Sequence, residues 1–141
     1  MGAEPRPMVV VDASVAVKWL CAGSEHGVQA ATDLLERHIE GDLVLVAPSL
    51  LAYEVLNVVH RKSRGANVLA DTMEALFDLE ITFVEADRVR MIGAAKLVQA
   101  RGISTFDAAY AALAASFDAE LATADRRLAN ALGGAVNCVL L

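Results

Sequence analysis

Short apolar runs alternate with longer helical segments along the chain, and this alternation constrains the fold more than any other feature. The strand-like runs are Val9–Val11, Val44–Ala47, Ile81–Val84, Leu121–Thr123 and Val136–Leu140. Strands that are almost wholly apolar are typical of a parallel sheet, because helices on both faces bury both sets of side chains. We therefore predict an α/β domain, a three-layer sandwich in which a five-stranded, mostly parallel sheet is flanked by helices.

Helical periodicity, capping residues and breakers predict the helices between these strands. The expected helices are Val15–Leu20, Glu25–Glu40, 50–63 capped by Ser49, Asn67–Leu79, 88–101 capped by Asp87, Ser104–Phe117 and Arg126–Leu132. The chain has 141 residues and shows no linker, repeat or low-complexity segment. We expect one domain at residues 8–141, preceded by a flexible N-terminal tail at residues 1–7.

Hydropathy and cysteine usage predict a cytoplasmic protein without a membrane segment. No apolar run reaches the roughly 18–20 residues that a membrane span needs. The N-terminus lacks a secretory pattern, because its short apolar stretch is broken by Asp12. Cys21 and Cys138 are isolated and are expected to be reduced thiols. His26, His38 and His60 lie at no ligand spacing and are expected at the surface.

The balance of charge and apolar residues limits the partners. A formal net charge of −6 repels nucleic acid, so a polyanionic substrate would need a metal and local basic patches. Hydrophobic residues make up 56% of the chain, more than a small domain is expected to bury. This excess favours a homodimer or a bound partner.

Four carboxylates stand at informative positions. Asp12 directly follows one predicted strand, and Asp125 follows another after a single residue. Asp107 lies in the first turn of an alanine-rich helix, and Glu54 lies on a leucine-rich helix face. Sites in open parallel sheets form beyond the carboxyl ends of the strands, where Asp12 and Asp125 fall. If the fold gathers all four, their oxygens suit a hard cation such as Mg²⁺ or Mn²⁺.

Each of these acids also has a purely structural interpretation. Asp12 and Asp125 can cap the helices that follow them. Asp107 fits a capping box with Ser104. Glu54 would be costly to bury without a partner, and a salt bridge to Arg61 would satisfy it.

Four segments together resemble the signature blocks of PIN-domain ribonucleases, and more narrowly the VapC-type toxins of prokaryotic toxin–antitoxin pairs. The segments are Val9–Leu20, Pro48–Val55, Ser104–Tyr110 and Leu121–Leu128. Their order and spacing cover essentially the whole chain. The set of four is specific, whereas any single block would be a weak signal.

The resemblance implies a PIN-like fold and a metal-dependent ribonuclease. At the matching positions Asp12, Glu54, Asp107 and Asp125 would be the catalytic residues and would bind one or two Mg²⁺ or Mn²⁺ ions. Ser14 and Thr123 match small hydroxyl residues that support such sites. Members of the family usually form homodimers and bind a small VapB-type antitoxin.

Basic and aromatic residues near these blocks are candidates for contact with RNA or a partner. They are Lys18, Trp19, Arg61, Arg126 and Arg127. Core packing is the alternative for the tryptophan, and a solvated surface is the alternative for the arginines.

The residues that two other α/β functions require are missing from this chain. A haloacid-dehalogenase-type phosphatase needs a second Asp where this chain has Ser14, and a dinucleotide-binding domain needs a glycine-rich turn after the first strand. The remaining alternative is a catalytically silent module of the same fold that binds a protein partner.

Overall fold

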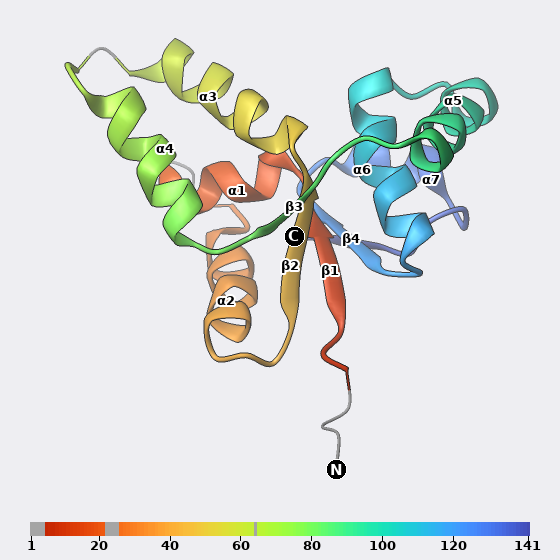
Figure 1. The fold of residues 1–141 in the computed structure, drawn as a ribbon, viewed down its shortest axis with the longest axis horizontal. Coiled ribbons are helices and arrows are strands. Elements are labelled where there is room, and N and C mark those ends of the chain that lie inside the picture. The colour runs from red at the N-terminus through yellow and green to blue at the C-terminus, as the bar shows by residue number, and fades with distance from the viewer. Residues whose placement is uncertain (1–4, 22–25, 64) are drawn as a thin grey trace.

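The chain folds into a five-stranded parallel sheet covered by helices on both faces in a computed structural model, which describes residues 5–21, 26–63 and 65–141 (Figure 1). The strands are β1 (Met8–Val11), β2 (Val44–Pro48), β3 (Thr82–Val84), β4 (Glu120–Thr123) and β5 (Cys138–Leu140). The helices are α1 (Ala13–Leu20), α2 (Val28–Ile39), α3 (Leu50–Lys62), α4 (Val68–Asp78), α5 (Arg88–Arg101), α6 (Thr105–Ser116) and α7 (Arg126–Leu132). The predicted α/β sandwich is confirmed, and all strand pairs are parallel.

The strand order β3-β2-β1-β4-β5 places the first strand at the centre of the sheet. The chain leaves β1 toward β2 and β3, and it returns through α5 and α6 to β4 on the other side of β1. Figure 1 accordingly shows α1–α4 on one side of the sheet and α5–α7 on the other. The connections therefore diverge between β1 and β4, which is the switch point where doubly wound sheets form sites.

The core follows from the apolar strands and the alanine-rich α6. Val10, Val11 and Leu45 are fully buried between the two helical layers. Six of the twelve residues of α6 are buried, namely Ala108, Tyr110, Ala111, Ala112, Leu113 and Ala114. The small side chains of the four alanines among them let this helix lie close to the central strands.

Local signals set most element boundaries, with one clear exception. Asp87 caps α5 through the Arg90 N–H, and Gly102 ends it in a left-handed conformation, as predicted. Ser49 does not cap α3 with its side chain, because its own backbone is helical and its hydroxyl donates to Glu85 instead. The predicted cap was wrong because Glu85, which directly follows β3, lies 36 positions away in sequence, so local spacing could not reveal it as the partner.

The N-terminal segment and the three histidines agree only in part with the sequence-based expectations. Residues 1–4 of the predicted tail lie outside the described residues, whereas Pro7 accepts a hydrogen bond from the Val44 N–H at 2.9 Å. His26 and His60 are exposed, as expected. His38 is half-buried: its Nε2 lies 2.8 Å from the Leu79 carbonyl, and its Nδ1 accepts from the Leu45 N–H, so it joins α2 to the sheet.

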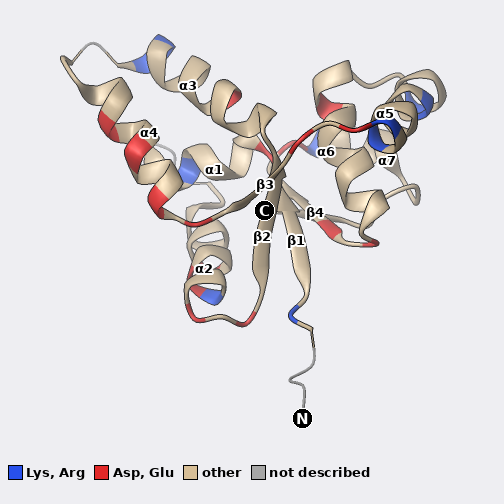
Figure 2. Ribbon diagram, viewed as in Figure 1, with Lys and Arg blue, Asp and Glu red and all other residues tan. Residues whose placement is uncertain are grey.

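Charge is distributed unevenly over the two helical layers (Figure 2). Helix α4 carries three acidic residues and no basic one, whereas α5 carries four basic residues and no acidic one. Arg126 and Arg127 add to the basic side at the start of α7. In the part of the chain that the structure describes, no helix is long and apolar enough to cross a membrane.

Candidate active site

Asp12 lies at the centre of a buried network of hydroxyl groups at the carboxyl end of β1. Its side chain is 6% exposed. The Thr123 hydroxyl donates to Oδ2 and the Ser14 hydroxyl donates to Oδ1, each at 2.5 Å. The N–H of Val15 also donates to Oδ1 at 3.3 Å, so Asp12 is the helix cap that local spacing predicted as well. The capping and site interpretations of this residue are therefore compatible.

The same hydroxyls tie β4 to β1. Ser14 Oγ accepts from the Ala124 N–H at 2.9 Å, and Thr123 Oγ1 accepts from the Asp125 N–H at 3.0 Å. The backbone of β4 and the loop after it are thus held on both sides of Asp12. This arrangement places Ser14 and Thr123 in direct contact with Asp12, and their supporting role in a site stays a prediction.

Asp107 lies in the first turn of α6, and Asp125 caps the N-terminus of α7. The Asp107 N–H donates to Ser104 Oγ at 3.0 Å, which forms the predicted cap of α6. Asp125 Oδ1 accepts from the Leu128 N–H at 3.2 Å and caps α7. Both carboxylates line one cavity of about 290 Å³, together with Arg127. Arg126 is exposed and does not line it.

Glu54 approaches the site from α3 and is half-buried. Its Oε1 accepts a hydrogen bond of 2.5 Å from the phenol of Tyr110. Among the described residues Glu54 forms no ion pair with Arg61, which is exposed near the far end of α3. Local spacing could not reveal Tyr110 as the partner, although the residue falls within the block that follows Ser104.

The electrostatics link the acids to one another. Burial is the main cause that raises the pKa of Asp12, and the charge of Asp107 adds to it, against hydrogen bonds from Ser14, Thr123 and Val15. Burial also raises the pKa of Asp107, with a further contribution from the charge of Asp125, against the Ser104 hydroxyl. Asp12, Asp107 and Asp125 therefore lie close enough for their negative charges to disfavour one another's ionisation.

The phenol of Tyr110 is affected by the negative charges of the same acids. Burial first, then its bond to Glu54 and the charges of Glu54, Asp12 and Asp107, raise the pKa of this phenol far above its usual value. Tyr110 therefore lies within electrostatic reach of three of the four predicted acids. No Lys or Arg among the described residues forms an ion pair with any of the four.

The oxygen atoms of this cluster are suitable ligands for a divalent cation, but the side chains are too far apart in this structure to bind one together. The groups are carboxylate and hydroxyl oxygens, which are the donors that Mg²⁺ and Mn²⁺ prefer. Across residues 5–21, 26–63 and 65–141, no three His, Cys, Asp or Glu side chains converge closely enough to hold a metal ion. The carboxylates of Asp12, Glu54 and Asp125 each accept from their own hydroxyl or N–H donors, so a shared metal stays a prediction.

Two of the predicted contact residues join α1 to α2. The Lys18 ammonium donates to the His26 carbonyl at 2.6 Å. The Trp19 indole donates to the Ala31 carbonyl at 2.7 Å, and its ring packs against the core. The core-packing interpretation of Trp19 is therefore correct, and its contact with a partner stays a prediction.

Comparison with known proteins agrees with the residue pattern. The sequence profile of the PIN domain matches residues 9–132. No curated protein matches the chain.

Solved structures of similar fold come from several organisms. PAE2754 from Pyrobaculum aerophilum is 22% identical with a TM-score of 0.66, over 96% of this chain and 92% of that one. VapBC2 from Rickettsia felis, bound to a DNA fragment from its promoter, is 12% identical with a TM-score of 0.73, over 95% and 98%. VapC20 from Mycobacterium tuberculosis, described as a sarcin-ricin loop cleaving toxin, is 15% identical with a TM-score of 0.67, over 87% and 94%.

Proposed function

This chain belongs to the PIN domain family, and from that premise we propose that it is a nuclease, the toxin of a type II toxin–antitoxin pair, which hydrolyses RNA phosphodiester bonds with Mg²⁺ or Mn²⁺. The observation that carries the proposal is the uncompensated acidic cluster around Asp12 at the switch point of the sheet. A buried carboxylate next to other carboxylates is costly unless a cation joins them.

Asp12 and Asp107 are the proposed principal ligands, because burial raises the pKa of both and the negative charge of Asp107 raises that of Asp12 further. Asp125 is exposed and Glu54 is half-buried, and both would complete the shell directly or through water. A divalent cation bound there would polarise the phosphoryl group and lower the pKa of a water molecule. Ser14 and Thr123 would hold Asp12 in one orientation throughout.

The substrate would meet the basic side of the molecule. Arg127 shares a cavity with Asp107 and Asp125, and α5 carries four basic residues without an acidic one. Local cations of this kind would offset the repulsion between an RNA backbone and a chain of net charge −6. The description of VapC20 as a sarcin-ricin loop cleaving toxin supports RNA as the proposed substrate class.

The proposed partners follow from other similar structures. Similar folds occur in a toxin–antitoxin complex from Klebsiella pneumoniae and in a member of the VapBC family of toxin–antitoxin systems from Mycobacterium tuberculosis, which supports a VapB-type antitoxin for this chain. An acidic toxin suits a basic antitoxin segment, with arginine offered to the carboxylates of the cleft. As an RNA-cleaving toxin the protein would act in the cytoplasm.

We also propose a homodimer through the face formed by α3, α5 and α6. An apolar groove of about 280 Å³ lies there, lined by residues that include Leu50, Val84, Met91 and Phe106. Met91 is 50% exposed and Phe106 is 60% exposed. Large exposed apolar side chains around a groove are a usual mark of a protein interface.

The decisive experiment incubates the purified chain, freed of any partner, with structured RNA in Mn²⁺, in Mg²⁺ and in EDTA, beside Asp12→Asn. Cleavage that needs the cation and is lost in the variant supports the proposal. Full activity in a rigorously purified, folded Asp12→Asn protein would overturn the assignment of the site. Failure to bind Mn²⁺ and RNA, with tight binding to a protein partner, would favour the silent interaction module.

A further inference from the structure

We infer that Tyr110 is a positioning residue of the site, whose hydroxyl holds the Glu54 carboxylate within the acidic cluster and leaves one of its oxygens for a cation or for water. The inference rests on the proposed function, since it assigns a position to Glu54 within that site. Its basis is the 2.5 Å hydrogen bond from Tyr110 to Glu54 Oε1, which joins α6 to α3.

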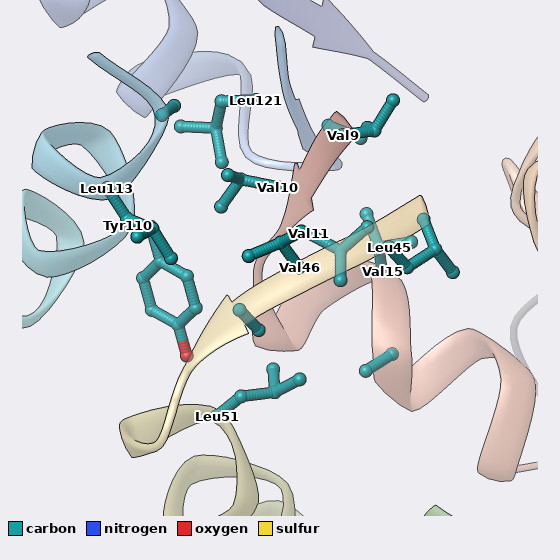
Figure 3. Close-up of a cluster of buried hydrophobic side chains, with 14 of the residues drawn as sticks. Val9, Val10, Val11, Val15, Leu45, Val46, Leu51, Tyr110, Leu113 and Leu121 are labelled. Carbon is teal, nitrogen blue, oxygen red and sulfur yellow. The ribbon is translucent and has the colours of Figure 1, made fainter. Parts of the chain in front are cut away.

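The ring of Tyr110 is fixed by packing. The residue is 1% exposed and is the largest of the fully buried side chains in the described part of the chain. Figure 3 shows the ring within the cluster of buried side chains, with its oxygen directed toward the region where β2 meets α3. A buried phenol with an immobile ring can donate only in a narrow range of directions.

Glu54, in contrast, needs outside help to hold one conformation. It is half-buried on α3, and a long glutamate side chain loses rotamer entropy when it is fixed. Tyr110 engages Oε1, and Oε2 accepts no hydrogen bond from any described residue. The bond therefore selects one rotamer and one free oxygen, without contributing a charge.

The position of Tyr110 relative to Asp107 makes this role specific. The two residues are three apart on α6, so they lie on the same helix face. One helix face thus presents one acid to the site directly, and controls a second acid on α3 through the phenol.

A purely structural alternative is that Glu54 serves only to satisfy the buried phenol. In that case the removal of the hydroxyl changes stability but leaves the response to a cation unchanged. The two interpretations are separated by Tyr110→Phe, which keeps the ring, with Tyr53→Phe as the matched control. Tyr53 is next to Glu54 in sequence but is 73% exposed.

The first readout is Mn²⁺ affinity, measured by calorimetric titration without RNA. Tyr110→Phe is expected to weaken binding 3- to 10-fold, and Tyr53→Phe to change it less than 2-fold. With RNA, Tyr110→Phe should lower kcat at least 10-fold with little change in KM. Unchanged Mn²⁺ affinity and kcat in folded Tyr110→Phe would overturn the inference.

The second readout is spectroscopic and holds even if the protein is no ribonuclease. The chain has two tyrosines, so Tyr53→Phe leaves Tyr110 as the one tyrosine signal in resonance Raman spectra. That signal should report a strong donor, should weaken in Tyr53→Phe/Glu54→Ala, and should shift on addition of Mg²⁺. A signal identical with and without Glu54 would remove the basis of the inference. Loss of the Mg²⁺ response alone, with the donor signature intact, would count against the metal site and hence the proposed function.

Discussion

Thr123 at the end of β4 donates its hydroxyl to Asp12 at the end of β1 across 111 positions of sequence, at 2.5 Å. The same oxygen accepts from the Asp125 N–H. One hydroxyl group therefore sets the distance between the first and last acidic blocks of the chain. Because Thr123 is fully buried, this bond is shielded from competing water.

Thr123→Val should destabilise the protein by about 1–3 kcal/mol, because it leaves Asp12 Oδ2 and the Asp125 N–H without a buried partner. Urea unfolding in EDTA measures this change. Thr82→Val is the matched control, since Thr82 is exposed on β3, and it should stay within about 0.5 kcal/mol of the parent. Equal effects of the two substitutions would show that the hydroxyl contributes nothing particular.

Asp12→Asn should change the pH dependence of stability. The pKa of Asp12 is raised in the folded protein, so the folded state binds this proton more tightly than the unfolded chain does. Its contribution to stability is full below the unfolded value near 3.8 and is lost as the pH rises through the folded pKa. The stability of Asp12→Asn relative to the parent should therefore increase between pH 4 and 7.5 in EDTA. A difference that is constant over this range would contradict the expectation.

Divalent cations should stabilise the parent chain, because they bind the folded acidic cluster and not the unfolded chain. At a free Mn²⁺ concentration of 100 times Kd the gain is about 2.7 kcal/mol. Thermal unfolding with Mn²⁺ and then with excess EDTA measures the gain and its reversal. Asp107→Asn should abolish most of it. An identical gain in Asp107→Asn would place the bound cation elsewhere.

Arg127→Ala should weaken RNA binding more than Arg126→Ala, because only Arg127 lines the cavity with Asp107 and Asp125. Loss of one phosphate contact lowers the salt dependence of binding by about one unit of slope. The test measures RNA binding by both variants over a series of salt concentrations, with Asp12→Asn added to each so that the RNA is not cleaved. Equal slopes for the two variants would exclude a specific contact by Arg127.

Met91→Asp should disrupt self-association, since it places a charge in the apolar groove beside Phe106. Ile39→Asp is the control, because Ile39 is 69% exposed on α2, in the opposite helical layer. Sedimentation of both variants should show a monomer for the first and the parent state for the second. A parent chain that is monomeric at all concentrations would rule out the proposed homodimer.

Much of the site could be predicted from sequence because its acids stand at the ends of elements. Asp12, Asp107 and Asp125 follow strands or open helices, and local capping geometry in the structure matches their spacing. Glu54 was expected to point inward, and its half-buried position agrees. Tyr110 and His38 were missed as polar contacts, because their partners lie 56 and 41 positions away.

The sequence by itself determined the order and type of the elements, because apolar periodicity and capping act over a few residues. It also indicated burial on both faces for the apolar strands, which holds for β1, β2 and β4 but not for the edge strands β3 and β5, whose side chains are partly exposed. Only the tertiary structure decided that β1 lies between β2 and β4, that Thr123 reaches Asp12, and that Tyr110 reaches Glu54. Such contacts depend on how distant elements pack together, and no local pattern of residues encodes that packing.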